Sequence, residues 1–412
     1  MSIDTKMAWR NIWRNTRRTI LTICAIAFAS LLLVFMLSFQ FGSYETMINT
    51  AVKIHTGHLQ IQAKDYQEKK NIRLVVATPT DVAAVLEKIP QVRSYTFRGQ
   101  AFSLVSSKDR TYGALVTGID PEREAAVSRL KSLIRKGGYL TGDDTEQALI
   151  GKILARNLRV DVGDELTVLG QGRDGSIAAT VVKIKGIYSS GIDDFDRSAI
   201  HIPLKTFQEV YSMQGAVHEV VIIAASLADV ADIKAGIKSA FSTGDYKSRL
   251  NVLDWNELMP GLRQSIEMDL ISGLIFYLLL VLVVAFSILN TFLMAIFERT
   301  REFGVLMAIG TTPNRLTKLL LIESLSITFI GIVAGMIIGS LLTIYFQIHG
   351  IDISGASELL NQFGISGRVY PKLSWISALS GPLAVLIITF FAALYPALKV
   401  QRMQPVQAMR TN

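Results

Sequence analysis

The fold is decided by the stretch LISGLIFYLLLVLVVAFSILNTFLMAIF, residues 270–297, which contains no Asp, Glu, Lys or Arg. A helix of about 20 residues crosses a hydrocarbon core roughly 30 Å thick. Three further runs without these charges occupy residues 19–44, 324–351 and 373–398. Buried helices of soluble proteins rarely reach this length without a charge. The sequence therefore predicts four membrane-spanning helices.

The composition agrees with a membrane protein. Half of the 412 residues are hydrophobic and only 18% are charged, which excludes a simple soluble protein. The single cysteine, Cys24, excludes an intramolecular disulfide and a cysteine zinc site. The run at residues 19–44 is too long for the apolar part of a signal peptide, and no A-x-A cleavage site follows it. We expect it to be a retained span.

Basic residues gather in three short segments beside the predicted spans. The N-terminal residues 1–18, the loop 298–323 and the tail 399–412 hold the whole formal net charge of +8. Residues 45–269 contain 28 basic and 28 acidic residues, and the short loop 352–372 is also balanced. The positive-inside rule therefore predicts cytoplasmic termini and an extracytoplasmic location for the two balanced segments. The anionic partner of this charge is then the inner leaflet rather than nucleic acid.

The N-terminal segment combines tryptophan with arginine at the edge of the first span. Trp9 and Trp13 are one helical turn apart, and Arg17 and Arg18 follow them. This mixture is typical of an interfacial helix that lies along the membrane surface, with these four residues as anchors. The alternative is that the helix continues the first span into the cytoplasm.

Residues 45–269 have the pattern of a large α+β domain, expected to have two lobes, inserted after the first span. Asp120 and Pro121 predict the start of a helix, with Asp120 as the N-cap, and Gly137 predicts its end. Further helices are expected at residues 80–89 and 226–241, and strands at residues 58–62, 165–169, 177–187 and 218–224. The predicted fold class is thus a polytopic α-helical membrane protein with four transmembrane helices and a large inserted α+β extracytoplasmic domain.

Residues 45–269 show no catalytic or metal-binding motif. A Gly-x-Ser-x-Gly elbow and a His-Glu-x-x-His zinc helix are both missing from the sequence. His55 and His58 are expected to be surface histidines. Asp193, Asp194 and Asp196 lack the spaced glycine and distal glutamate of a calcium loop, so a solvated acidic turn is expected.

The loop between the second and third spans begins ERTREFGVLMAIGTTP, residues 298–313. Glu298 and Glu302 are one helical turn apart, and apolar residues at helical spacing supply one side: Phe303, Leu306, Met307 and Ile309. Such a helix can transmit force to a cytoplasmic partner, or it can lie on the membrane without one. The spacing alone favours neither.

This loop resembles that of the FtsX-like permeases, the membrane subunits of the MacB and LolC/LolE class of ABC transporters. Residues 9–19 are similar to the opening of that family, and residues 395–397 and 405–410 to its closing segment, although Gln404 and Met409 depart from it. Within the large domain, the stretches that resemble a MacB-type periplasmic core domain are Gly118-Ile-Asp-Pro121, Ile150-Gly151, Leu154-Ala155, Val162-Gly-Asp164 and Ile202-Pro203.

The resemblance implies a multi-pass protein of the bacterial inner membrane that pairs with a second permease subunit and binds ABC ATPase subunits. ATP and Mg would be used by those ATPase chains, whose closure is passed through the loop to the periplasmic domain. The coupling roles would fall to Glu298, Arg299, Arg301, Glu302, Phe303, Gly304 and Gly310. The sequence agrees, because it contains no phosphate-binding Gly-x-x-x-x-Gly-Lys-[Ser/Thr] loop. We therefore expect a transport subunit with no cofactor, metal or catalytic residue of its own.

The resemblance favours release of lipoproteins from the inner membrane, as in LolC and LolE, with a periplasmic carrier or adaptor as a further partner. A MacB-like efflux permease is one alternative. A regulator of a periplasmic cell-wall hydrolase, like FtsX, is another.

The third predicted span carries Gly331, Gly335 and Gly339 at four-residue intervals. Such a stripe lets another helix approach closely, within one subunit or between two. Glu323 stands at the inner end of this span. We expect it to reach the membrane interface rather than to pair with an arginine.

Overall fold

The computed structural model describes residues 3–242, 249–352 and 368–401, which form two compact units. The membrane unit draws on Met1–Tyr44, Ile266–Asp352 and Arg368–Asn412, and the globular unit contains Glu45–Ser265. The closing motif at residues 405–410 lies outside the described residues.

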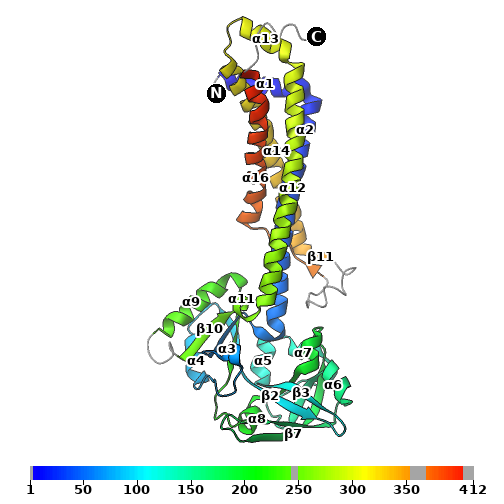
Figure 1. Ribbon diagram of the computed structural model, residues 1–412, viewed down its shortest axis with the longest axis vertical. Helices are drawn as coiled ribbons and strands as arrows, with labels where there is room; N and C mark the ends of the chain where they lie inside the picture. The colour runs from blue at the N-terminus through cyan, green and yellow to red at the C-terminus, as the bar shows by residue number, and fades with distance from the viewer. Residues whose placement is uncertain (1–2, 243–248, 353–367, 402–412) are drawn as a thin grey trace. The chain divides into compact units, whose positions relative to one another are not determined.

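Four long helices dominate the membrane unit (Figure 1). They are α2 (Thr16–Ala51), α12 (Pro260–Glu298), α14 (Pro313–His349) and α16 (Trp375–Gln401). All four are long and apolar enough to cross a membrane, which confirms the predicted fold class. Helices α2 and α12 continue beyond the charge-free runs, because a helix does not have to end where its hydrophobic stretch ends.

The four helices share an apolar core and differ in how much of their surface they bury. The core includes Ile26 and Leu33 of α2, Ile288 of α12, Ile327 of α14 and Val385 of α16. Only 11% of the most apolar window of α12 is buried, against 33% to 39% in the other three helices. Helix α12 therefore presents most of its apolar surface outward.

Short elements complete the membrane unit. Helix α1 (Ile3–Ile12) is separated from α2 by the 3₁₀ turn η1 (Trp13–Asn15) and contacts α14. Helix α13 (Thr300–Ala308) lies between α12 and α14 in the chain. Strands β11 (Ile351–Asp352) and β12 (Arg368–Val369) form a small antiparallel pair.

The globular unit is built on a mixed ten-stranded sheet in the order β10-β1-β9-β2-β3-β8-β5-β7-β4, with β6 paired to β2 and β7. The β3–β8 and β5–β7 pairs are parallel. The strands are β1 (Leu59–Ala63), β2 (Val92–Ser106), β3 (Thr111–Ile119), β4 (Ile134–Gly137), β5 (Gln147–Gly151), β6 (Glu165–Gln171), β7 (Ile177–Tyr188), β8 (Ala199–Pro203), β9 (Glu219–Ala224) and β10 (Leu250–Asp254).

Short helices accompany this sheet. They are η2 (Val52–Thr56), α3 (Tyr66–Lys69), α4 (Pro79–Leu86), α5 (Pro121–Val127), η3 (Leu130–Leu133), α6 (Lys152–Leu158), α7 (Asp193–Ser198), α8 (Leu204–Val210), η4 (Leu227–Asp229), α9 (Val230–Ala240) and α11 (Trp255–Leu258). One hydrophobic core lies between β1, β9, β10, α4 and α9, and another between the far half of β2, β3 and β5 to β8. The long strand β2 takes part in the pairing of both regions, so the two cores share one sheet.

The helix after Asp120 begins as predicted and ends early. The Asp120 carboxylate accepts hydrogen bonds from the N–H groups of Glu122 and Arg123, at 3.1 and 3.3 Å. The helix stops at Val127, and residues 134–137 form β4 instead. The predicted end at Gly137 is wrong, because pairing of β4 with β7 outweighs the local helical pattern.

The prediction of surface histidines is also wrong, and within the predicted acidic turn Asp193 and Asp194 are exposed as expected whereas Asp196 is not. His58 is 2% exposed, because the turn at Gly57 leads the chain directly into β1, between β10 and β9. His55 is half-buried, and its ring lies beside Arg98 and Gln100. Asp196 is 3% exposed and accepts hydrogen bonds from the Ser190 N–H at 2.8 Å and the Ser190 hydroxyl at 2.7 Å.

Buried histidines make the globular unit sensitive to acid. Burial lowers the pKa of His58, His201 and His218 to about 4, against 6.5 in the unfolded chain. Between these values the unfolded state binds more protons, so stability falls as the pH falls from about 6.5 to 4, by on the order of 3 kcal/mol per histidine. We expect the melting temperature of this unit to drop over that interval, and His218→Asn to reduce the slope. A melting temperature that stays constant from pH 7 to 4 would contradict this account.

Candidate functional site

The candidate site is the region around α13, where the chain leaves α12 and enters α14. Helix α12 ends at Glu298, and Arg299 breaks the helix with φ −104° and ψ 5°. At the other end, Gly310 has φ +99°, a conformation that favours glycine. The Thr311 N–H donates to the Leu306 carbonyl and the Gly310 N–H to the Met307 carbonyl, which is a Schellman C-cap. Helix α13 is thus a short, separately capped element.

Phe303 anchors α13 to the membrane helices. Its side chain is fully buried, and the Arg299 guanidinium lies 5.3 Å from its ring centre. The neighbours of Phe303 in this cluster come from α12, α14 and α16: Ile296, Leu316, Leu320 and Val400. Gly304 is buried beside it. One aromatic side chain thus packs α13 against three long helices.

Arg299 links α13 to α14 through a buried ion pair. Its Nη1 lies 3.1 Å from Oε2 of Glu323, and both side chains are about nine-tenths buried. Its Nε lies 3.4 Å from Oε2 of Glu302. The expectation that Glu323 reaches the interface is wrong, because the break at Arg299 turns its guanidinium towards α14.

Two further ion pairs join α13 and the end of α12 to the N-terminal region. The Arg14 guanidinium donates to both carboxylate oxygens of Glu302, at 2.8 to 3.0 Å, and Arg18 donates to Glu298 at 2.7 Å. Burial raises the pKa of Glu302, but the hydrogen bonds and charges of Arg14 and Arg299 outweigh it and lower that pKa. Exposed pairs contribute roughly 1 kcal/mol or less each, so their main effect is to fix the register of α13.

A signal for these two ion pairs was present in the sequence, but it appears only when the N-terminal segment and the loop are compared with each other. Arg14 and Arg18 are four residues apart, and so are Glu298 and Glu302. Two helices with opposite charges at the same interval match each other when they lie side by side.

The remaining face of α13 points outward. Arg301, Val305, Ala308 and Ile309 are all exposed and share one side of the helix. Val305 is 49% exposed and Ile309 is 74% exposed. The predicted apolar side is therefore divided, because Leu306 and Met307 pack with Phe303 whereas Ile309 does not.

The glycine stripe on α14 faces α2 of the same chain. A Cβ atom at Gly335 would lie 2.2 Å from the Ala27 carbonyl oxygen, and one at Gly331 would lie 2.8 Å from Cβ of Ile26. At Gly339 the nearest atom would be Cα of Leu31, at 3.1 Å. The backbones of α14 and α2 can approach this closely because these positions carry no side chain.

A polar cluster that we did not predict joins α2 to α12. Tyr44 donates to the Asp269 carboxylate at 2.5 Å, and the Gln40 amide donates to the Tyr44 hydroxyl at 2.7 Å. Tyr277 donates to the Gln40 carbonyl at 2.7 Å. A Cβ at Gly273 would meet the Gln40 amide at 2.7 Å. This cluster is a specific attachment for a helix that otherwise buries little surface.

The predicted membrane anchors have different environments. Trp9 and Trp13 are 47% and 43% exposed, with ring centres 6.1 Å apart. Arg17 is exposed, whereas Arg18 is engaged by Glu298. Exposed tryptophans beside an exposed arginine suit a membrane surface.

The geometry of this region is that of a mechanical contact between helices. Within residues 3–242, 249–352 and 368–401, no group of three or more His, Cys, Asp or Glu side chains is placed to hold a metal ion. The buried charged groups at α13, Arg299 and Glu323, pair with each other.

Comparisons with known proteins place these features in context. A family model described as "MacB-like periplasmic core domain" matches residues 19–240, more than half of the chain, and one described as "FtsX-like permease C-terminal" matches residues 274–405. The lipoprotein-releasing system transmembrane protein LolC of Xylella fastidiosa is 26% identical over 73% of this chain and 74% of its own length. LolE of Haemophilus influenzae is 20% identical over 79% of both chains. The macrolide export ATP-binding/permease protein MacB of Chlorobaculum tepidum is 24% identical over 98% of this chain and 60% of its own length.

Proposed function

The chain belongs to the family that combines a MacB-like periplasmic core domain with an FtsX-like permease part, and we propose that it couples ATP hydrolysis by a separate ATPase chain to movements of its globular unit. It is an ABC transporter permease of the LolC, LolE and MacB type. The observation that carries the coupling role is α13, which is anchored by buried Phe303 and presents Val305 and Ile309 outward.

The exposed face of α13 suits a protein partner. Two apolar side chains beside Arg301 form a small patch of the kind that docks into a groove, and a groove on an ATPase subunit is the proposed acceptor. The sequence has no nucleotide-binding loop, whereas the longer MacB relative is named as an ATP-binding/permease protein. ATP and Mg are therefore assigned to another chain.

The charge distribution supports an orientation. The basic segments at residues 1–18, 298–323 and 399–412 lie on the cytoplasmic side, where an ATPase finds its nucleotide. The globular unit then lies in the periplasm of the producing bacterium, and the protein is a multi-pass component of the inner membrane.

A second permease subunit, identical or related, is proposed to cover α12. The outward apolar surface of this helix includes Leu274, Phe276, Val283 and Phe286, each at least 60% exposed. Lipid can cover such a surface, but the small burial of α12 within its own chain leaves room for a helix of a neighbouring subunit.

The proposed cargo is a membrane-anchored lipoprotein. This proposal rests on the LolC and LolE relatives, because this chain aligns with about three quarters of the length of each. Efflux of a small amphiphile is the second candidate, and the match of MacB to 98% of this chain favours it. Proteoliposomes that contain the permease, its ATPase and a triacylated lipoprotein distinguish lipoprotein release from efflux. Addition of ATP releases the lipoprotein only if the cargo is a lipoprotein.

The coupling role is tested by placing a charge on the exposed face of α13. Val305→Asp and Ile309→Asp are each expected to lower co-purification of the ATPase and its stimulated ATP hydrolysis about tenfold, because a desolvated carboxylate weakens an apolar contact. Both side chains are exposed, so the melting temperature of the permease should be kept. Lys318→Gln, an exposed change on α14, serves as the control. Normal ATP hydrolysis in both aspartate variants would count against this function.

A further inference from the structure

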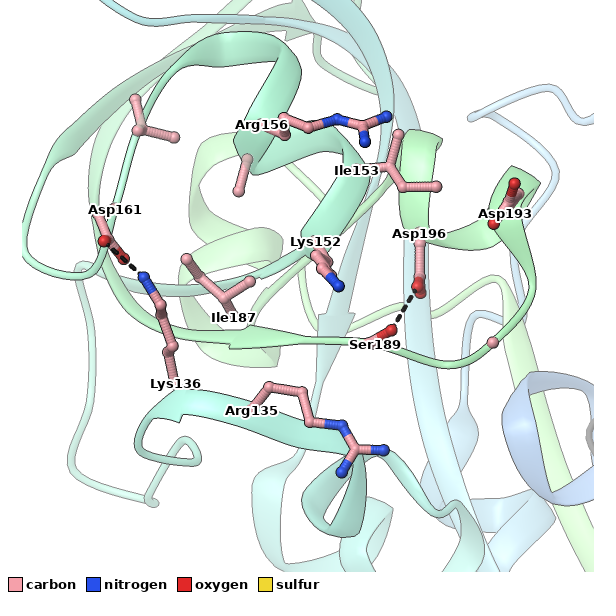
Figure 2. A pocket seen from close by; sticks show the side chains of 13 residues that line it. Arg135, Lys136, Lys152, Ile153, Arg156, Asp161, Ile187, Ser189, Asp193 and Asp196 are labelled. Carbon is pink, nitrogen blue, oxygen red and sulfur yellow. Dashed lines mark hydrogen bonds and ion pairs between the residues drawn. The ribbon is translucent and has the colours of Figure 1, made fainter. Parts of the chain in front are cut away.

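A pocket in the globular unit has a charge pattern that its own side chains do not balance. It lies between α6, β4, the end of β7 and α7, with a volume of about 550 Å³, within the range of small-molecule sites (Figure 2). Its cationic lining residues are Arg135 and Lys136 of β4 and Lys152 and Arg156 of α6. None of them belongs to the α13 site.

The cations of the pocket differ in whether they have partners. Lys136 lies 2.8 Å from Oδ2 of Asp161. For Arg135, Lys152 and Arg156, the described part of the chain provides no ion pair or side-chain hydrogen bond. In Figure 2 these three side chains follow one another across the pocket, and their charged ends point to the same side of the view. Three positively charged side chains without an ion-pair partner among the described residues therefore line one pocket.

Two of the three carboxylates that line the pocket already have hydrogen-bond or ion-pair partners. Asp161 pairs with Lys136, and Asp196 is held by the N–H and hydroxyl of Ser190 and by the Ser189 hydroxyl. Asp193 is the third carboxylate of the lining, which leaves the pocket with one positive charge in excess.

The position of the two α6 cations strengthens this argument. Lys152 and Arg156 are four residues apart and occupy the same face of a seven-residue helix. Like charges at this spacing destabilise a helix by a few tenths of a kcal/mol. A bound anion removes that repulsion and supplies the acceptor that both side chains lack.

The wall beside these charges is apolar. The apolar lining residues are Ile153 and Ala155 of α6, Val160 just after α6, and Ile187 of β7. Ile187 is 6% exposed and Ala155 is 3% exposed, so both belong to the packed interior and form a rigid wall of the pocket. A ligand that fits both halves has an anionic head and a short apolar part.

We propose that this pocket binds an anionic amphiphile, whose phosphate or carboxylate head contacts Arg135, Lys152 and Arg156 and whose apolar part lies against Ile153, Val160 and Ile187. The proposal does not depend on the coupling role of α13. The globular unit then has a ligand site of its own. The same cations and apolar side chains would contact a soluble amphiphile or the headgroup region of a lipid.

The test uses the full chain in phosphatidylcholine nanodiscs, with hexyl phosphate as the probe and titration calorimetry as the readout. We expect saturable binding of hexyl phosphate that is about tenfold tighter than that of inorganic phosphate, because the hexyl chain buries apolar surface. Hexanol should not bind measurably, since it lacks the charge. Lys152→Gln and Arg156→Gln should each weaken binding about tenfold or more.

Two controls make the result specific. Lys238→Gln removes an exposed cation from α9, away from the pocket, and should leave the affinity unchanged. Nanodiscs that contain phosphatidylglycerol identify the source of the head group: competition with hexyl phosphate points to a lipid, and no competition points to a soluble amphiphile. The proposal is overturned if hexyl phosphate fails to bind, if it binds no more tightly than inorganic phosphate, or if Lys152→Gln and Arg156→Gln bind it as the unmodified protein does.

Discussion

Arg299→Ala is expected to lower the free energy of unfolding of the membrane unit by about 3 to 5 kcal/mol and to abolish ATPase coupling. Glu323 is 8% exposed, and Arg299 is its partner at 3.1 Å. Removing the guanidinium leaves a buried carboxylate without its counter-charge and also removes the cation above the Phe303 ring. Thermal unfolding of the purified permease measures the loss of stability, and ATP hydrolysis by the assembled complex measures the loss of coupling.

The cause of this loss is separated from a general effect on α13 by two further variants. The double variant Arg299→Leu with Glu323→Leu removes both charges, and its stability should recover most of the loss. Arg301→Gln changes an exposed arginine on the same helix and should melt like the unmodified protein while reducing coupling. An Arg299→Ala protein that melts within about 1 kcal/mol of the unmodified one would contradict the role assigned to this pair.

Gly335→Leu is expected to prevent α2 and α14 from packing. The Cβ alone would lie 2.2 Å from the Ala27 carbonyl oxygen and 2.7 Å from Cβ of Ser30, and the neighbours at this distance are backbone or a short side chain. The helices must separate, at a cost of about 3 kcal/mol or more. The measurement is the fraction of folded protein recovered from the membrane and its melting temperature.

Gly261→Leu is the matched control for this substitution. It also replaces a helical glycine with leucine, but no heavy atom beyond its own surroundings lies within 4 Å of the added Cβ. Its stability should be unchanged or slightly raised, because leucine is the better helix former. Equal losses in the two variants would mean that the α2–α14 contact does not explain the stripe.

The membrane helices were predictable because their signal is local. A run such as residues 270–297 has to satisfy its backbone hydrogen bonds internally in lipid, and only a helix does so. The N-cap at Asp120 was equally local, since one side chain and the next N–H groups determine it. Strand β4 was missed because its partner β7 is about fifty residues away in the chain.

The sequence directed attention to residues around α13 but did not show their contacts. Glu302 and Phe303 stood out in a short motif, whereas Arg14 lies 288 residues from the carboxylate that it binds. For Glu323 the sequence favoured the interface over an arginine partner, because spacing along the chain does not show that the helix break at Arg299 turns its guanidinium towards this carboxylate. Similarly, the burial of Asp196 depends on where the loop after β7 folds back.

The central claim is that the exposed face of α13 docks a separate ATPase, and a photo-crosslinking amino acid at position 305 tests it most directly. In membranes that contain the assembled complex, illumination is predicted to join position 305 to a protein that mass spectrometry identifies as a nucleotide-binding ATPase subunit. A crosslinker at position 329, which replaces an exposed phenylalanine of α14 within the apolar span, should give no such product. Absence of an ATPase adduct from position 305, or equal yields from the two positions, would contradict the account.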